Sequence, residues 1–162
     1  MTILQVRHAL KIAVIGYGAI GSFVVEHLIG EPALDVVGML SEPPPASTPQ
    51  VRLFDSIDAL LGAQPDVVVE CAGHRALKAF GELVLCQGPD LLVASVGALA
   101  DRELEAGLHR AASASGGRLL IPGGALGGID ANSAAREAGL TSVLAPYSLI
   151  HSIKKRAGLV VT

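Results

Sequence analysis

The chain has 162 residues, of which 51% are hydrophobic, 17% charged and 3% aromatic, and its formal net charge is −3. This composition excludes a disordered chain, and the length has room for one ordinary domain with a substantial core. A nucleic-acid surface is also disfavoured, because it needs a basic stripe and stacking aromatic rings.

The first element that we expect is a strand from Leu10 to Ile15, followed by a glycine-rich turn and a helix from Ile20 towards Leu28. The turn has G-x-G-x-x-G spacing through Gly16, Gly18 and Gly21. In dinucleotide-binding folds the first glycine permits a tight turn, the second lets the backbone approach a pyrophosphate, and the third lets the helix pack closely. The helix N-terminus then offers unpaired N–H groups to the phosphates. The residues that we assign to the cofactor here are Gly16, Gly18, Ala19, Ile20 and Gly21.

A second strand is expected from Asp35 to Leu40. The motif normally places an acidic residue at the end of this strand to bind the ribose hydroxyls. That position falls on Ser41, which we assign to the cofactor, and Glu42 follows it. Ser41 cannot repel a 2′-phosphate, while Glu42 can still reach the ribose. Both NAD and NADP therefore stay open as the cofactor.

Apolar runs and helical spacings alternate through the rest of the chain. Further strands are expected at Val51–Phe54, Asp66–Cys71, Leu91–Ser95 and Arg118–Ile121, with the start of another at Val143–Ser148. Further helices are expected from Ile57 after a cap at Asp55 or Ser56, at Arg75–Leu85 with Leu77, Phe80, Leu83 and Val84 buried, from the cap Asp101 to Gly116, and at Ile129–Ala138. This alternation predicts an α/β fold with a doubly wound parallel sheet of Rossmann type and helices on both faces. We place this domain at residues 1–122 and the start of a second, incomplete domain at residues 123–162.

Several residues at the end of the strand at Asp66–Cys71 are candidates for chemistry. Ala72 and His74 are expected at the carboxyl edge of the sheet, where ligands bind in such folds. We assign both to the cofactor, with a helix cap or a solvated side chain as the alternative for His74. Glu70 needs a partner inside an apolar strand, and either a hydrogen bond in the pocket or an edge position would supply one. Cys71 is favoured as a space-filling thiol over a nucleophile, because no histidine can be assigned to activate it.

The remaining sequence gives no sign of metal, membrane or disulfide chemistry. The histidines share no ligand spacing, two cysteines are too few for a disulfide framework, and no apolar run reaches the ~18 residues of a membrane span. No export signal is apparent. We expect a cytoplasmic protein that has no metal and meets neither membrane nor nucleic acid.

A second glycine-rich turn spans Gly123 to Gly128. Its backbone can approach the nicotinamide ribose, and the helix after it can hold a substrate carboxylate. A hinge between domains is the alternative, and both readings stay open.

With these segments in view, the chain resembles the L-aspartate dehydrogenase family. The resemblance rests on the segments Ile15–Gly21, Val69–Ala72, Ser95–Leu99 and Ile121–Ala131. It implies an NAD(P)-dependent amino-acid dehydrogenase that oxidises L-aspartate to iminoaspartate, which yields oxaloacetate and ammonia or feeds NAD biosynthesis. It also implies that Ala125 contacts the cofactor.

Two departures from the family bear on catalysis. Gly124 stands where the family commonly has serine, and the second domain with its catalytic histidine has no counterpart here. His151 lies in the wrong part of the pattern to replace that histidine, so the catalytic residues stay unknown. We therefore expect the cofactor-binding portion of such an enzyme, truncated before the catalytic domain is complete.

Two other functions stay open. One is an NAD(P)-binding module without catalysis, and the other is a two-domain reductase of the homoserine dehydrogenase or dihydrodipicolinate reductase type. Because a missing second domain would leave an apolar face uncovered, we also expect a homo-oligomer.

Overall fold

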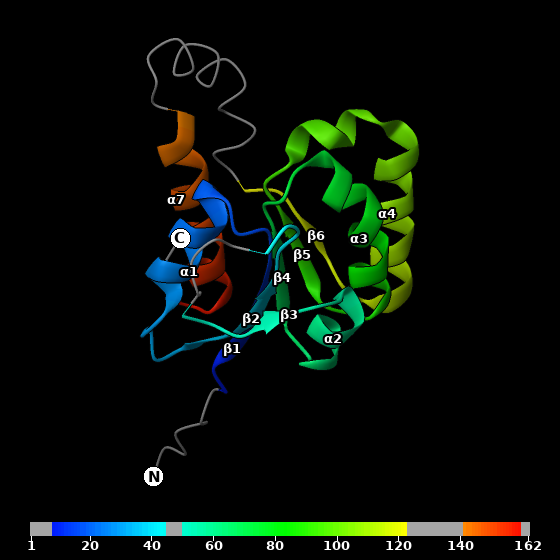
Figure 1. Ribbon diagram of the computed structural model, residues 1–162. Coiled ribbons are helices and arrows are strands. Elements are labelled where there is room, and N and C mark those ends of the chain that lie inside the picture. The colour runs from blue at the N-terminus through cyan, green and yellow to red at the C-terminus, as the bar shows by residue number, and fades with distance from the viewer. Residues whose placement is uncertain (1–7, 45–49, 123–140, 160–162) are drawn as a thin grey trace.

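A parallel sheet between two layers of helices forms the body of the protein in the computed structural model, which describes residues 8–44, 50–122 and 141–159 (Figure 1). The strands are β1 (Leu10–Ile15), β2 (Leu34–Leu40), β3 (Leu53–Phe54), β4 (Val67–Glu70), β5 (Asp90–Val93) and β6 (Leu119–Leu120). The helices are α1 (Ala19–Leu28), α2 (Ile57–Gly62), α3 (His74–Cys86), the 3-10 helix η1 (Val96–Ala100), α4 (Arg102–Ser115) and α7 (Thr141–Arg156).

The strand order is β3-β2-β1-β4-β5-β6, and every neighbouring pair is parallel. The chain winds outwards in one direction from β1 to β3 and in the other from β4 to β6. The order therefore reverses between β1 and β4, which is the place where doubly wound sheets bind their ligands. The predicted fold class is confirmed.

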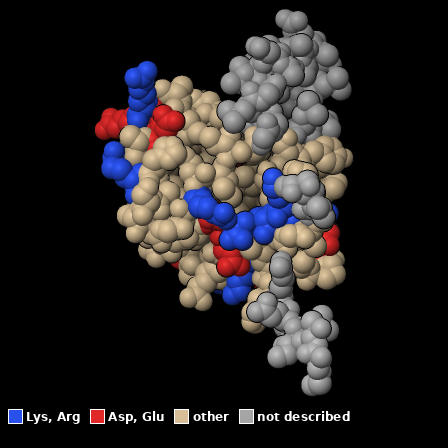
Figure 2. Space-filling model, turned by 180° about the vertical axis from the view of Figure 1, so that it is seen from behind, with Lys and Arg blue, Asp and Glu red and all other residues tan. Residues whose placement is uncertain are grey.

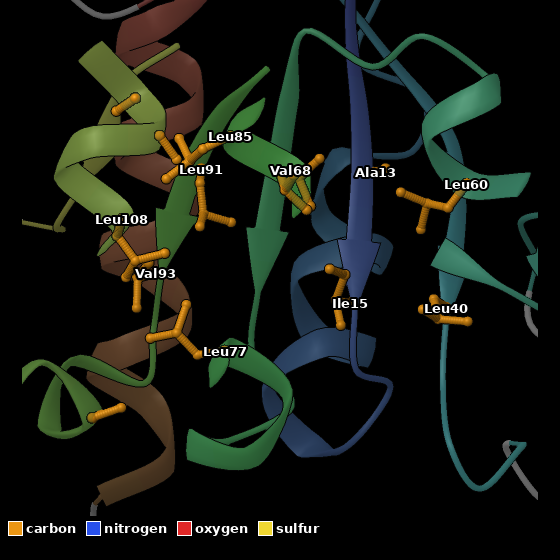
Figure 3. Packing of buried hydrophobic residues seen from close by; sticks show 14 of the residues in the cluster. Ala13, Ile15, Leu40, Leu60, Val68, Leu77, Leu85, Leu91, Val93 and Leu108 are labelled. Carbon is orange, nitrogen blue, oxygen red and sulfur yellow. The ribbon is translucent and has the colours of Figure 1, made fainter. Parts of the chain in front are cut away.

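Both faces of the sheet are covered. Along β1, Ile12 and Val14 pack towards α1 and α7, while Ala13 and Ile15 pack towards α2, α3 and α4. All four side chains are at most 2% exposed. On the second face, Figure 3 shows side chains from α3 and α4 beside those of β5. Strands buried on both faces explain the near-continuous apolar runs in the sequence.

The predicted caps are confirmed, and one predicted core position is wrong. The Ser56 hydroxyl accepts a hydrogen bond from the Ala59 N–H at the start of α2, Asp101 caps α4, and Gly116 ends α4 with a left-handed φ of 83°. Leu83 is 51% exposed, however, and Leu85 is buried in its place. Leu77 and Leu85 stand eight residues apart on one helical face, whereas position 83 lies off that face.

The expected strand at Val143–Ser148 is wrong, because this segment belongs to α7. The same helix continues beyond this segment, where the buried residues Leu149, Ile150 and Ile153 recur at helical spacing. These side chains pack against α1 and the sheet, so α7 covers an apolar face of the Rossmann domain (Figure 1). The domain boundary at residue 122 stays a prediction, since the 18 residues after it lie outside the described part of the chain.

Polar contacts also hold α7 against the rest of the domain. Lys154 forms an ion pair with Glu31, 3.2 Å apart, and Arg156 Nε donates to Asp90 at the start of β5, 2.9 Å away. Arg118 donates to the same carboxylate. Burial alone would raise the pKa of Asp90, but hydrogen bonds from the two arginines hold that pKa below its usual value.

Charge is sparse on the face seen in Figure 2. A group of Lys and Arg side chains there lies beside Asp and Glu side chains, and most of that face carries no charge. Within the described residues, no helix combines the length and the apolarity that crossing a membrane requires.

Candidate cofactor site

Loops from β1, β2, β4 and β5 meet at the carboxyl edge of the sheet because the four strands are parallel. The Gly16 N–H donates to the carbonyl of Leu40 over 2.8 Å, which holds the glycine turn beside the end of β2. The Cys71 N–H donates to the Ile15 carbonyl over 2.9 Å, which holds the β4–α3 loop on the other side. The glycine turn thus lies at the point where the strand order reverses.

The three glycines of the turn have three different surroundings. Gly16 has a φ of 102°, and a Cβ on it would lie 2.8 Å from the Ala72 nitrogen. A Cβ on Gly21 would collide with the carbonyl oxygen of Gly16, because α1 packs directly on the turn. A Cβ on Gly18 would meet nothing within 4 Å. The first and third glycines are therefore required by the fold, and only the middle one faces open space.

The start of α1 faces that open space. Gly18 is the N-cap, and it has no side-chain cap. The N–H groups of Ala19, Ile20 and Gly21 in the first turn have no helical acceptors, as at every helix start. Together with the positive end of the helix dipole they form a site suited to an anion such as a pyrophosphate.

A hollow of about 290 Å³ lies beside the turn, between the ends of β1, β2 and β4. Its polar lining comes from Glu42 and Arg75, and Leu40 and Phe80 supply apolar walls. A neighbouring hollow of about 380 Å³ shares Leu40 and Glu42 and includes Ser41, Phe54 and Asp55. The Ser41 hydroxyl itself donates to the carbonyl of Pro43 over 2.9 Å.

The sequence placed Arg75 at the start of a helix and did not connect it with the site. The available signal was its position directly after the loop at the carboxyl edge of β4. A guanidinium suits a 2′-phosphate and a carboxylate suits the ribose diol, so Arg75 and Glu42 favour different cofactors.

The larger hollow at the opposite, amino edge of the sheet is a weaker candidate. It measures about 920 Å³, and its lining includes Asp66, Asp90, Arg118 and Arg156. Asp66 already accepts a hydrogen bond from the Lys11 N–H, and Asp90 holds both arginines. Three of the charged groups in this lining, Asp90 and the two arginines, already bind one another, and ligands of doubly wound sheets bind at the other edge.

Cys71 fills the space between the turn and α1. Its thiol donates to the carbonyls of Ile15 and Gly16 at 3.4 and 3.5 Å, and its Sγ would lie 3.1 Å from a Cβ on Gly21. Burial, followed by repulsion from Glu70, raises the pKa of Cys71 to about 12. A thiol that stays protonated is a poor nucleophile, so these contacts favour the space-filling role.

The two cysteines should therefore differ sharply in reactivity. At pH 8 we expect exposed Cys86 to react quickly with Ellman's reagent, and Cys71 to react only after unfolding, since its thiol is packed under the turn and its raised pKa keeps it protonated. The measurement is the number of fast-reacting thiols per chain, before and after adding guanidinium. Cys86→Ser is the control and should leave no fast thiol, whereas two fast thiols in the unchanged chain would contradict the assignment.

His74 is the first residue of α3 and is exposed. The N-cap of that helix is Gly73, without a side-chain cap, so the imidazole does not cap α3. The ring lies against Gly97 of η1 instead, where a Cβ would be 3.1 Å from Nε2. The structure thus places His74 between the β4–α3 and β5–η1 loops, and its contact with the cofactor stays a prediction.

Glu70 is 1% exposed, and hydrogen bonds satisfy its carboxylate. Its Oε1 accepts from the N–H groups of Ala72 and Gly73 and from the Ser95 hydroxyl, each over 2.9 Å. Its Oε2 accepts from the Ser95 N–H over 3.2 Å. Of the two partners that the sequence left open, the hydrogen bonds at the site are the ones present. The sequence could not identify them, because Ser95 lies 25 residues further along the chain.

Two remaining expectations concern other parts of the chain. Ala125 and the whole second glycine turn lie outside the described residues. Among the residues that the structure does describe, no group of three His, Cys, Asp or Glu side chains could hold a metal ion.

Comparisons with known proteins give independent information about the family to which this chain belongs. Residues 16–122 match the family model described as "Homoserine dehydrogenase, NAD binding domain". L-aspartate dehydrogenase 1 of Bordetella pertussis is 42% identical over 136 residues, and L-aspartate dehydrogenase of Pseudomonas aeruginosa is 43% identical over 145 residues. Each match covers 83% of this chain and 53% of the relative, so the chain spans about half the length of the curated relatives it matches. The crystal structure of aspartate dehydrogenase from Thermotoga maritima superposes with a TM-score of 0.60 at 26% identity, over 78% of this chain and 51% of that one.

Proposed function

Because this chain belongs to the family of NAD-binding domains of homoserine dehydrogenase type, and resembles the cofactor-binding half of L-aspartate dehydrogenases, we propose that it holds NAD or NADP for the oxidation of L-aspartate. The observation that carries the proposal is the glycine turn. Gly16 and Gly21 have no room for a side chain, whereas Gly18 opens on free space at the start of α1. This distribution is what a bound pyrophosphate requires.

The described residues have distinct tasks in this proposal. The first turn of α1 binds the pyrophosphate through its N–H groups. Glu42 and Arg75 line the adenosine side, and the β5–η1 loop lies on the nicotinamide side of the point where the strand order reverses. When bound, the nicotinamide would supply the redox chemistry: it would take a hydride from Cα of the amino acid while the amino nitrogen loses a proton to solvent, which would leave iminoaspartate. The chain's own contribution is to bind and orient the cofactor.

A binding module without catalysis is the second candidate. The observation that favours it is the family match, since residues 16–122 match a model that is described as an NAD binding domain. The description of the matching family also keeps a homoserine dehydrogenase type of substrate in view.

Titration of the 162-residue chain with NADH and NADPH, followed by turnover assays, separates these candidates. We expect saturable binding of at least one dinucleotide, read from the fluorescence of the reduced nicotinamide, and NAD(P)H formation from L-aspartate. Binding without turnover on L-aspartate, L-homoserine or other amino acids would favour the module, and binding of neither dinucleotide would reject both candidates. The two cofactors are titrated in parallel because Glu42 and Arg75 favour different ones.

The setting of this activity is part of the same proposal. We propose that the chain acts in the cytoplasm as a homo-oligomer, with L-aspartate as its small-molecule substrate. Light scattering at high concentration measures the oligomeric state, and a clean monomer would contradict the proposed homo-oligomer.

A further inference from the structure

Two buried charged side chains, Glu70 and Asp90, lie at opposite edges of the sheet. Asp90, at the amino edge, is neutralised by two arginines. Glu70, at the carboxyl edge, forms no ion pair within the described residues, and only N–H and O–H donors satisfy it. A buried carboxylate without a cation is expensive unless several hydrogen bonds compensate it. The four donors that do so all belong to the two loops that border the candidate cofactor site.

The hydrogen bonds of Glu70 reach those two loops in different ways. Ala72 and Gly73 are in the β4–α3 loop, where Gly73 has a φ of 103° and leads into α3. Ser95 precedes η1, and both its N–H and its hydroxyl point at the carboxylate. Glu70 therefore joins two loops that are distant in sequence, and it does so from a strand whose own position is fixed on both sides by β1 and β5.

Both loops continue directly to the site. The Ala72 backbone occupies the place that a Cβ on Gly16 would need, so its position also sets the position of the glycine turn. The segment after Ser95 carries Gly97, against which the His74 ring lies. Displacing either loop would change the surface that faces the cofactor.

We propose that Glu70 is a positioning residue that holds the β4–α3 and β5–η1 loops in the conformation that receives the nicotinamide half of the dinucleotide. The proposal rests on the proposed function, because it concerns the same site. The nicotinamide half is the one concerned because β5 lies beyond β4 from the switch point, whereas the adenosine half lies towards β2.

Glu70→Gln tests the proposal with little change of shape. The amide nitrogen would face at least one of the present donors. The Ser95 N–H, the one donor that the described residues place on Oε2, is the one most easily lost. We expect NADH to bind about tenfold more weakly, and ADP, which lacks the nicotinamide and its ribose, to bind within about twofold of the unchanged chain. Ser95→Ala removes one donor and should weaken NADH in the same direction by a smaller factor.

Asp90→Asn is the matched control. It alters the other buried carboxylate, at the opposite edge, so it should lower the melting temperature while the ratio of the NADH and ADP dissociation constants stays unchanged. A ratio that changes as much in Asp90→Asn as in Glu70→Gln would show a general loss of stability and would overturn the positioning role. An unchanged ratio in Glu70→Gln would overturn it as well. If Glu70→Gln does not fold, Ser95→Ala decides by the same ratio.

Amide hydrogen exchange gives a readout that needs no cofactor. In Glu70→Gln the amide of Ser95 should lose protection first, followed by those of Ala72 and Gly73, while amides in the centre of β4 keep theirs. Unchanged exchange at all three loop amides would overturn the proposal even if NADH binds. An unchanged chain that binds neither NADH nor ADP would overturn the proposed function and the cofactor half of this inference, and the exchange data would still decide whether Glu70 orders the loops.

Discussion

Gly18→Val should abolish dinucleotide binding while the protein stays folded. The N-cap φ of −81° and ψ of −163° is accessible to any residue, and a Cβ would meet nothing within 4 Å. The valine side chain would instead fill the space in front of the first turn of α1 and exclude the pyrophosphate. Losing several hydrogen bonds to a charged group, at roughly 1.5–3 kcal/mol each, corresponds to at least about a hundredfold weaker binding.

Two measurements check this expectation. The melting temperature should fall by no more than about 3 °C, since replacing glycine at an N-cap costs at most about 1 kcal/mol. Fluorescence titration with NADH should show no saturation at concentrations that saturate the unchanged chain. A folded Gly18→Val chain that keeps its NADH affinity would show that the pyrophosphate does not bind at this turn.

Gly21→Val, the same substitution three residues later, should unfold or strongly destabilise the protein. A Cβ at this position collides with the carbonyl oxygen of Gly16 and would lie 3.1 Å from Cys71 Sγ. The carbonyl is backbone and cannot rotate away like a flexible side chain, so α1 would have to leave β1. Overpacking of this kind costs about 3 kcal/mol or more, and the melting temperature should fall by about 10 °C.

The two valine variants control one another. They have the same composition and lie in one turn, yet one should lose only the ligand and the other the fold. Circular dichroism during heating, with NADH titration of whatever remains folded, separates the two effects. A Gly21→Val chain with an unchanged melting temperature would refute the close packing of α1 on the turn.

The site also depends on groups whose partners are far apart in the chain. Glu70 and Ser95 belong to successive strand–loop units, and Cys71 fills a gap under the turn formed by residues 16–21. These contacts give the carboxyl edge a defined shape before any ligand arrives, which lowers the ordering cost of binding.

The sequence by itself determined the secondary structure and the sheet type wherever a local signal was strong. The glycine spacing at residues 16–21, the caps Ser56 and Asp101 and the doubly wound arrangement were predictable because turn geometry, capping and burial act over a few residues. The same local reasoning failed at Val143–Ser148, because a short apolar run fits a strand or a helix equally well.

Only the tertiary structure decided which distant groups meet. The same few features all depend on which loops the strand order brings together: the open space at Gly18, the four donors around Glu70, the packing of Cys71 under the turn, and the place of Arg75 in the hollow beside Glu42. So does the position of α7 against α1. The physical reason is that hydrogen bonds and packing act over a few ångströms in space, whereas the sequence states only how far apart their members lie along the chain.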